Sequence, residues 1–120
     1  MMETKELTIA VNGYRSPEIL RLCLQSIFKE MAGSQIDYEV LVADSATLED
    51  TEMLMREGFP TVRFFPFHEN VGFKTLVNVS LEQAQGRYVF LINSDILLSP
   101  GAVPMMLDYL KSGRDAQVCL

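Results

Sequence analysis

A run of ten residues, Gly86 to Asp95, constrains the fold of this chain more than any other stretch. Tyr88 to Ile92 is an unbroken apolar segment of residues that favour β-structure, and such a run is typical of a parallel strand covered on both faces. Asn93, Ser94 and Asp95 follow it, before more apolar sequence. Because burying an unpaired carboxylate is costly, we expect Asp95 to lie at the rim of the sheet, in contact with water, a metal or a ligand.

Ordinary turn chemistry is the alternative interpretation of these three polar residues. Asn and Asp also commonly end a strand and begin a turn without binding anything. In open α/β sheets, however, the carboxyl ends of the strands form the edge where ligands bind. The rest of the sequence is needed to choose between turn formation and ligand binding.

Apolar runs alternate with amphipathic segments along the chain, which predicts alternating strands and helices. Strands are predicted at residues 7–11, 38–43, 61–65 and 88–92, and helices at residues 17–32, 48–57, 73–85 and about 101–113. Such alternation implies right-handed crossovers and a doubly wound, mostly parallel sheet. We therefore expect one α/β domain over residues 1–120.

Several residues mark the limits of the predicted elements. Ser16 is placed as the N-cap of the first helix, with Pro17 at its first helical position. Pro66 is expected to end the third strand, because a proline cannot donate a hydrogen bond to a central ladder. Ala116–Leu120 has the composition of a further strand.

Charge and composition narrow the classes of function. The chain holds 10 basic and 16 acidic residues, for a formal net charge of -6. Nucleic-acid and anionic-membrane surfaces need clustered Lys and Arg, so both are disfavoured, and an anionic ligand would need a local remedy such as a metal. No segment has the length of a membrane span, and the first residues lack a signal pattern, so we expect a cytoplasmic protein. Cys23 and Cys119 are expected to be buried free thiols.

The predicted topology brings polar residues from three strands to one edge. If the first strand lies between the second and the fourth, the ends of the first and fourth border the crevice where the winding changes direction. Asn12, Gly13 and Tyr14 would then face residues 93–95, with Asp44 one strand away.

The usual phosphate-binding motifs are absent. The chain has no P-loop pattern and no Gly-x-Gly-x-x-Gly turn after the first strand. A phosphate ligand could instead be bound through a divalent cation, which takes carboxylate and phosphate oxygens together. Asp95 is the candidate anchor for the cation, and Asp44 could accept hydrogen bonds from a base or a ribose.

The order and spacing of these residues resemble the family 2 glycosyltransferases with the GT-A, or nucleotide-diphosphosugar transferase-like, fold. The resemblance covers nearly the whole chain. It is carried by Thr8–Leu20, by Tyr38–Asp44, by Asn70–Phe73 with Asn78, Ala84 and Gly86, by Asn93–Asp95 at the Asp-x-Asp position, and by Pro100–Ala102.

The resemblance implies roles for individual residues. Asp95 would hold Mg²⁺ or Mn²⁺ on the diphosphate of a UDP-, GDP- or dTDP-linked sugar, and Asp44 would contact the base. Asn93 stands where the first acid of Asp-x-Asp is usual, so Asp95 is the only charged ligand of that motif. Lys74 could replace a polar residue that many members carry at the position of Val77. The substrate-binding residues would be Asn12, Gly13, Tyr14, Asp44, Lys74, Asn93 and Ser94.

Family members continue into a second half that carries the acceptor site and, in inverting enzymes, the general base. Leu120 precedes any such half, so no residue is assigned as catalytic. The chain would then be the donor-binding half of a truncated GT-A fold, serving cell-wall or polysaccharide biosynthesis. We expect it to be inactive alone and to self-associate, as a homodimer or as larger aggregates.

Two alternatives stay open at this point. The first is a non-catalytic module of the same fold that binds a nucleotide-sugar or contacts another subunit. The second is an unrelated doubly wound protein, such as a receiver-like domain, whose acids would follow the first and third strands rather than the second and fourth.

Overall fold

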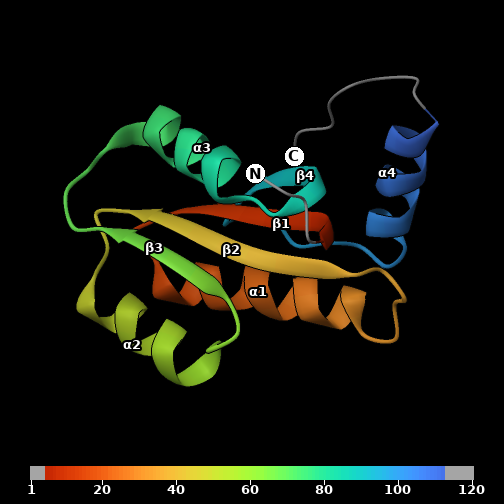
Figure 1. Cartoon of the computed structure of the whole chain (residues 1–120). Helices are drawn as coiled ribbons and strands as arrows, with labels where there is room; N and C mark the ends of the chain where they lie inside the picture. The colour runs from red at the N-terminus through yellow and green to blue at the C-terminus, as the bar shows by residue number, and fades with distance from the viewer. Residues whose placement is uncertain (1–4, 113–120) are drawn as a thin grey trace.

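The computed structural model describes residues 5–112, in which strands and helices alternate (Figure 1). The strands are β1 (Lys5–Tyr14), β2 (Tyr38–Ser45), β3 (Arg63–Phe67) and β4 (Gly86–Asn93). The helices are α1 (Pro17–Met31), α2 (Glu49–Gly58), α3 (Gly72–Gln83) and α4 (Ala102–Lys111). The strand predicted at Ala116–Leu120 lies outside the described residues.

The described strands form one parallel sheet in the order β3-β2-β1-β4. Helices α1 and α2 cover one face and α3 covers the other, so the sheet is doubly wound (Figure 1). The predicted α/β class and the predicted place of β1 between β2 and β4 are confirmed. This order brings the carboxyl ends of β1 and β4 together at the point where the winding reverses.

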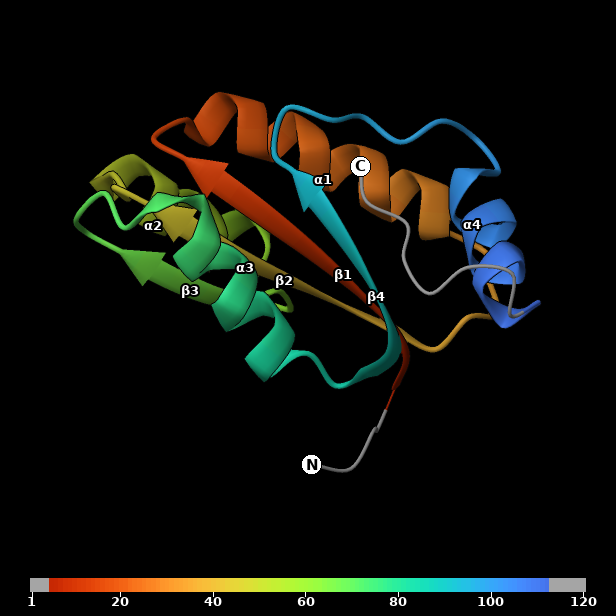
Figure 2. The same cartoon turned by 90° about the horizontal axis from the view of Figure 1, so that it is seen from above.

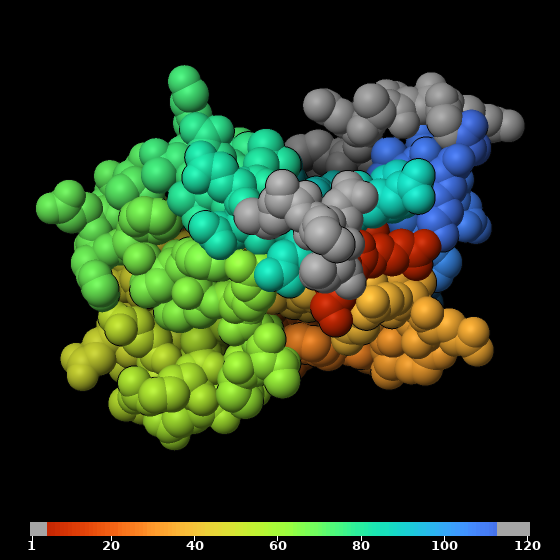
Figure 3. Space-filling view, in the orientation of Figure 1, coloured from red at the N-terminus to blue at the C-terminus, as the bar shows by residue number. Residues whose placement is uncertain are grey.

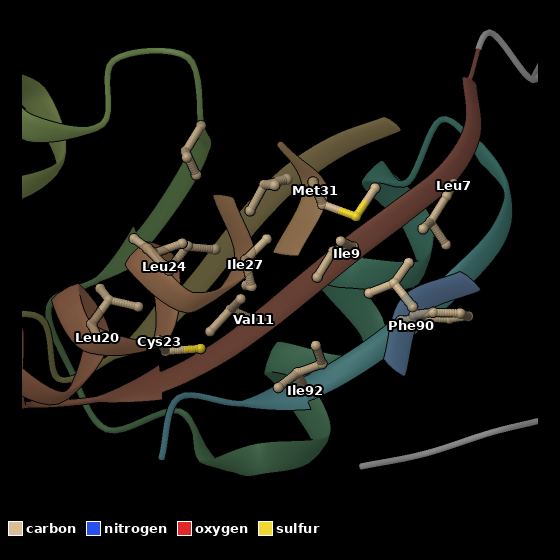
Figure 4. Packing of buried hydrophobic residues seen from close by; sticks show 14 of the residues in the cluster. Leu7, Ile9, Val11, Leu20, Cys23, Leu24, Ile27, Met31, Phe90 and Ile92 are labelled. Atoms are coloured by element: carbon tan, nitrogen blue, oxygen red, sulfur yellow. The ribbon is translucent and has the colours of Figure 1, made fainter. Parts of the chain in front are cut away.

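The main hydrophobic core lies between the sheet and α1 (Figure 4). Alternate residues of β1 point toward α1, and they meet a helix face whose apolar residues recur every three or four positions. Burying each such Leu or Ile contributes about 1.5–3 kcal/mol. The labelled residues of this core are Leu7, Ile9, Val11, Leu20, Cys23, Leu24, Ile27, Met31, Phe90 and Ile92.

The side chains on the opposite face of β1 are smaller and more polar, and α3 packs on them. Asn12 donates a hydrogen bond from Nδ2 to Ser80 Oγ at 2.9 Å, and Ser80 Oγ donates to the Leu76 carbonyl at 2.8 Å. Ser80 is fully buried and Asn12 is 6% exposed. The amide of Asn12 is therefore held by the fold.

A second polar cluster lies toward the amino ends of the strands. Glu39 Oε2 accepts hydrogen bonds from Thr8 Oγ1 and the Gln85 backbone N–H, both at 2.7 Å. Its Oε1 lies 2.9 Å from Arg63 Nη1, and Arg63 also donates to the Gln83 carbonyl. Burial alone would raise the pKa of Glu39, but these hydrogen bonds and the Arg63 charge together lower it.

The structure corrects several predicted boundaries. Pro66 lies inside β3, which begins at Arg63 rather than at residue 61. β3 is an edge strand of the described sheet, and an edge strand tolerates a proline because one side of its ladder is free. Figure 3 shows its atoms at the surface between α2 and α3. Ser16 occupies the N-cap of α1 as predicted, but its side chain makes no capping hydrogen bond.

Two further sequence expectations concern cysteine and membranes. Cys23 is a buried free thiol, as predicted, and Cys119 lies outside the described residues. Among the described helices, none has the length and hydropathy to cross a lipid bilayer.

Candidate functional site at the carboxyl edge of the sheet

A cavity of about 420 Å³ opens at the carboxyl ends of β1 and β4. Three groups of residues line it, from the end of β1 and the start of α1, from the start of α3, and from the end of β4. They are Asn12, Gly13, Tyr14, Ser16, Ile19, Asn70, Gly72, Phe73, Leu76, Asn93, Ser94 and Asp95. Another hollow of about 370 Å³, between α2 and β3, contains none of these polar residues.

The pairing of the strands explains why these residues meet. Asn12 lies opposite Asn93 in the β1–β4 ladder, and Gly13 lies opposite Asp44 in the β1–β2 ladder. The Ser94 backbone N–H donates to the Asn12 carbonyl at 3.0 Å, which carries the β1–β4 pairing one residue beyond the end of β4. The predicted meeting of residues 12–14 with residues 93–95, and the place of Asp44 one strand away, are confirmed.

Gly13 is the point of closest approach in this site. A Cβ at residue 13 would lie 2.5 Å from Asp44 Oδ1 and 3.8 Å from Ser94 Cβ. The Asp44 carboxylate therefore lies against the backbone of β1, at a position where any side chain larger than that of glycine would collide with it. Gly13 separates the Asp44 carboxylate from the cavity wall that Ser94 helps to form.

Asp44 carries an unpartnered polar atom. Its side chain is 1% exposed, and no described group forms a hydrogen bond with Oδ2. Burial raises the pKa of Asp44, and the Thr47 hydroxyl opposes this shift. A buried acceptor without a donor costs about 1–3 kcal/mol. Asp44 does not line the cavity itself, so Oδ2 can accept a hydrogen bond from a ligand only if the groups that cover it move aside.

The residues after β4 form a turn and also line the cavity. The Ile96 backbone N–H donates to the Asn93 carbonyl at 3.1 Å, which is the hydrogen bond of a β-turn. Asn93 and Asp95 are exposed. Turn chemistry and ligand binding are thus compatible here, because the turn leaves the Asp95 carboxylate exposed at the cavity.

The structure separates the other predicted site residues by their surroundings. Tyr14 lines the cavity and is 54% exposed. Asn12 also lines it, but its amide nitrogen is engaged by Ser80. Lys74 lies on the exposed surface of α3 and is not among the lining residues, although it is only one position after Phe73.

Sequence reasoning missed the network that holds the loop before α3. Ser45 Oγ accepts a hydrogen bond from the Val71 backbone N–H at 2.9 Å and donates to Asn70 Oδ1 at 3.2 Å. Asn70 Oδ1 also accepts from the Gly72 backbone N–H, an Asx-type turn that an Asn two residues before a Gly could have suggested. The network fixes one wall of the cavity to the end of β2.

The chain leaves both β1 and β2 through a left-handed residue. Arg15 and Ala46 directly follow these strands and have φ angles of 51° and 52°. Few residues other than glycine, Asn and Asp adopt this conformation, because Cβ then crowds the backbone. Two strained positions therefore flank the site.

A doubly wound parallel sheet with a cavity at its carboxyl edge, lined in part by polar residues, defines an α/β domain with a candidate ligand site. The chain belongs to glycosyl transferase family 2, whose sequence model matches residues 8–120. It is the N-terminal part of the GT-A fold that this family shares with the solved structures below.

Curated and solved proteins agree with this assignment. The chondroitin synthase of Escherichia coli is 27% identical over 105 residues, which are 85% of this chain and 15% of that protein. Residues 1–349 of Staphylococcus aureus TarS, solved with UDP-GlcNAc, superpose with a TM-score of 0.72 at 20% identity, over 89% of this chain and 31% of that one.

The mannosyltransferase PcManGT of Pyrobaculum calidifontis, solved with GDP-Man and Mn²⁺, has a TM-score of 0.71 at 23% identity. The match covers 98% of this chain and 35% of that one. At these identities the two solved structures establish the shared fold, and the chain spans about a third of each.

Proposed function

We propose that this chain is the donor-binding part of a family 2 glycosyltransferase, which binds a nucleotide-diphosphosugar through a divalent metal for transfer of the sugar to an acceptor hydroxyl. One observation carries the proposal. The Asp44 carboxylate, whose buried Oδ2 has no described partner, and the exposed Asp95 lie at the same edge of the sheet, and Gly13 lies between Asp44 and the cavity that Asp95 lines. The two acids offer different chemistry.

Asp44 is proposed to bind the nucleoside. An ionised carboxylate only accepts hydrogen bonds, and a base N–H or a ribose hydroxyl is a suitable donor. Oδ2 is already unpaired in the ligand-free chain, so a ligand that donates to it relieves this cost, and a ligand that does not donate gains nothing there. A nucleoside that supplies this hydrogen bond is selected over one that does not.

The diphosphate is proposed to bind through a metal at Asp95. None of the twelve described lining residues is a lysine, arginine or histidine, so no protein cation of the lining faces the phosphates. The position of Lys74 outside the lining supports this division of roles. With a formal charge of -6, the chain would repel a bare diphosphate unless a cation came with it.

The residues at Asp95 fit a substrate-associated Mg²⁺ or Mn²⁺. Such a cation is typically held by one or two carboxylates, with substrate phosphates and water as the remaining ligands. Within residues 5–112, no group of three or more possible His, Cys, Asp or Glu ligands occurs, and no side chain pairs with the Asp95 carboxylate. When bound, a divalent cation supplies positive charge that stabilises the diphosphate as leaving group.

Sugar transfer and the general base are assigned to a longer protein. The chain spans about a third of its solved neighbours, and no residue of the cavity is placed as the base that would deprotonate an acceptor. We therefore propose donor binding, without transfer, for these 120 residues alone. The cytoplasmic location, a role in polysaccharide or cell-wall synthesis and homodimer formation remain predictions.

Calorimetry with UDP, GDP and dTDP tests the proposal. Binding is expected to require Mn²⁺ or Mg²⁺ and to be largely lost in Asp95→Asn. Asp108→Asn is a matched control, because Asp108 is an exposed aspartate on α4 outside the cavity. Equal affinity with and without metal in the wild-type chain would overturn the metal-binding role of Asp95.

A further inference from the structure

The segment that follows Asp95 is tied along α1 by two side chains of that helix. The Leu98 backbone N–H donates to Ser26 Oγ at 3.2 Å. The backbone N–H groups of Gly101 and Val103 donate to the two carboxylate oxygens of Glu30, each at 3.0 Å. Figure 2 shows this segment running beside α1 from the end of β4 to the start of α4.

The contacting residues follow the same order along the segment and along α1. Residue 98 pairs with residue 26, and residues 101 and 103 pair with residue 30, one helical turn further. The segment from residue 98 to residue 103 therefore follows the helix.

The Glu30 carboxylate accepts hydrogen bonds at the amino end of α4, although Glu30 belongs to α1. It is the next-to-last residue of α1, where a negative charge is unfavourable because the carbonyl end of a helix is already negative. At the amino end of α4 the same charge is favourable. The N-cap of α4 is Gly101, with φ of 82°, which has no side chain to cap the helix, and Glu30 supplies the missing acceptors.

We propose that Ser26 and Glu30 are positioning residues for Asp95, holding the segment between β4 and α4 so that its carboxylate stays at the cavity. The proposal rests on the metal-binding role of Asp95 proposed above. It assigns part of the metal affinity to two side chains that do not line the cavity.

The physical reason is the entropy of a loop fixed at both ends. The near end of the segment is held by the Ser94 to Asn12 hydrogen bond and the turn at residues 93–96. Ser26 and Glu30 hold the far end. Without them, residues 96–101 would sample more conformations in the free chain, the turn at residues 93–96 would be held from one side only, and a metal bound at Asp95 would have to order that turn again. The free energy that this ordering costs appears as a weaker metal affinity.

Two measurements on the full 120-residue chain test the proposal. NMR relaxation of the amides of residues 96–101, without ligand, reports the order of the segment. Electron paramagnetic resonance with Mn²⁺ and UDP or GDP reports the metal affinity. The variants are Glu30→Ala, Ser26→Ala and the conservative Glu30→Gln, which keeps one acceptor oxygen.

Glu57→Ala is the matched control. Glu57 is the exposed, next-to-last residue of α2, so its removal reproduces the loss of an acid at a helix carbonyl end without touching the segment. Glu30→Ala is expected to mobilise residues 96–101 and to weaken Mn²⁺ binding about tenfold. Ser26→Ala and Glu30→Gln should fall between Glu30→Ala and wild type, and Glu57→Ala should match wild type.

The outcomes separate this inference from the proposed function. Unchanged relaxation at residues 96–101 in a folded Glu30→Ala chain would overturn the inference, whatever the metal does. Mobilised residues with unchanged Mn²⁺ affinity would also overturn it and leave Glu30 as a cap of α4 alone. If wild type binds nucleotide without any metal, the proposed function fails, and the positioning role fails with it even where the segment is mobilised.

Discussion

The Oδ1 atom of Asp44 occupies the space that a side chain at Gly13 would need, with 2.5 Å between the oxygen and an ideal Cβ. The two residues are partners in the β1–β2 ladder, and both are buried. The position of the Asp44 carboxylate is thus set by the absence of a side chain on the neighbouring strand.

Gly13→Ala is expected to destabilise the chain by about 1–3 kcal/mol, because a buried carboxylate cannot move away without distorting the strand. Nucleotide binding should be lost together with stability. Urea denaturation and calorimetry measure the two effects. Gly58→Ala is the control, since its Cβ would make an ordinary 3.6 Å contact with Leu54. Equal behaviour of the two variants would contradict the close approach.

Asp44→Asn should make the chain more stable at neutral pH and a weaker nucleotide binder. Because burial raises the pKa of Asp44, the folded chain keeps this proton at pH values where the unfolded chain has lost it. Stability therefore falls as the pH rises above the ordinary value of 3.8 and through the raised pKa, and the uncharged Asn removes that fall.

Binding to Asp44→Asn and Asp44→Ala is expected to weaken by about 1–3 kcal/mol, the cost of an unpaired polar partner, with metal dependence intact. Thermal unfolding between pH 4 and 8 checks the stability half of this prediction, and calorimetry checks the other. An unchanged affinity would reduce Asp44 to a turn residue.

Glu39→Gln should destabilise the chain at neutral pH. The substitution removes a contribution to the free energy of unfolding that the wild-type chain loses only in acid. The pKa of Glu39 is lowered in the folded chain, so its contribution is present above the ordinary pKa of a glutamate and disappears as the pH falls through the lowered value. A Gln at this position keeps one acceptor oxygen for Thr8, Gln85 and Arg63. The variant should unfold at lower urea concentration at pH 7, and the gap from wild type should narrow as the pH falls through the lowered pKa of Glu39.

Ala46→Gly should stabilise the chain by about 0.5–1 kcal/mol. Glycine adopts the left-handed conformation without the steric strain of a Cβ, and this gain exceeds the cost of the greater backbone entropy of glycine in the unfolded chain. Arg15→Gly tests the same physics after β1, because the two φ angles are nearly equal. Denaturation midpoints measure both. A destabilised Ala46→Gly chain would show that the positive φ is not strained.

The isolated chain is expected to self-associate at micromolar concentration. β4 has a free edge in the described sheet, and an unpaired edge can recruit a second chain. Leu97 is 61% exposed, although its neighbours Ile96 and Leu98 pack against the core. Light scattering measures the mass, and Leu97→Ser should lower the association. A monomer at all concentrations would contradict this expectation, while turnover with an acceptor would show that the chemistry lies within these residues.

Sequence reasoning located the site because its determinants are local and ordered. An apolar run followed by polar residues marks a strand end, and the assumed order, with the first strand between the second and the fourth, then brings Asn12 beside Asn93 without any knowledge of side-chain packing. The position of Asp44 one strand away follows from the same assumed order.

Other features depend on tertiary relationships that no local pattern contains. Whether Pro66 can sit inside a strand depends on that strand being at the edge. Lys74 is one residue from Phe73, yet the way α3 packs on the sheet puts one at the cavity and the other outside it. The Glu30 contacts join residues more than 70 positions apart in the chain, so the sequence carried no signal for them.

The buried chain of hydrogen bonds from Asn12 through Ser80 to Leu76 has a mechanical consequence. If α3 slid by one turn, about 5.4 Å, the amide of Asn12 would lose its acceptor in a place that water does not reach. The contact thus acts as a stop that sets how far α3 extends over the carboxyl edge. Phe73 at the start of α3 and Tyr14 at the end of β1 both line the cavity, so this contact fixes the α3 side of the cavity relative to β1.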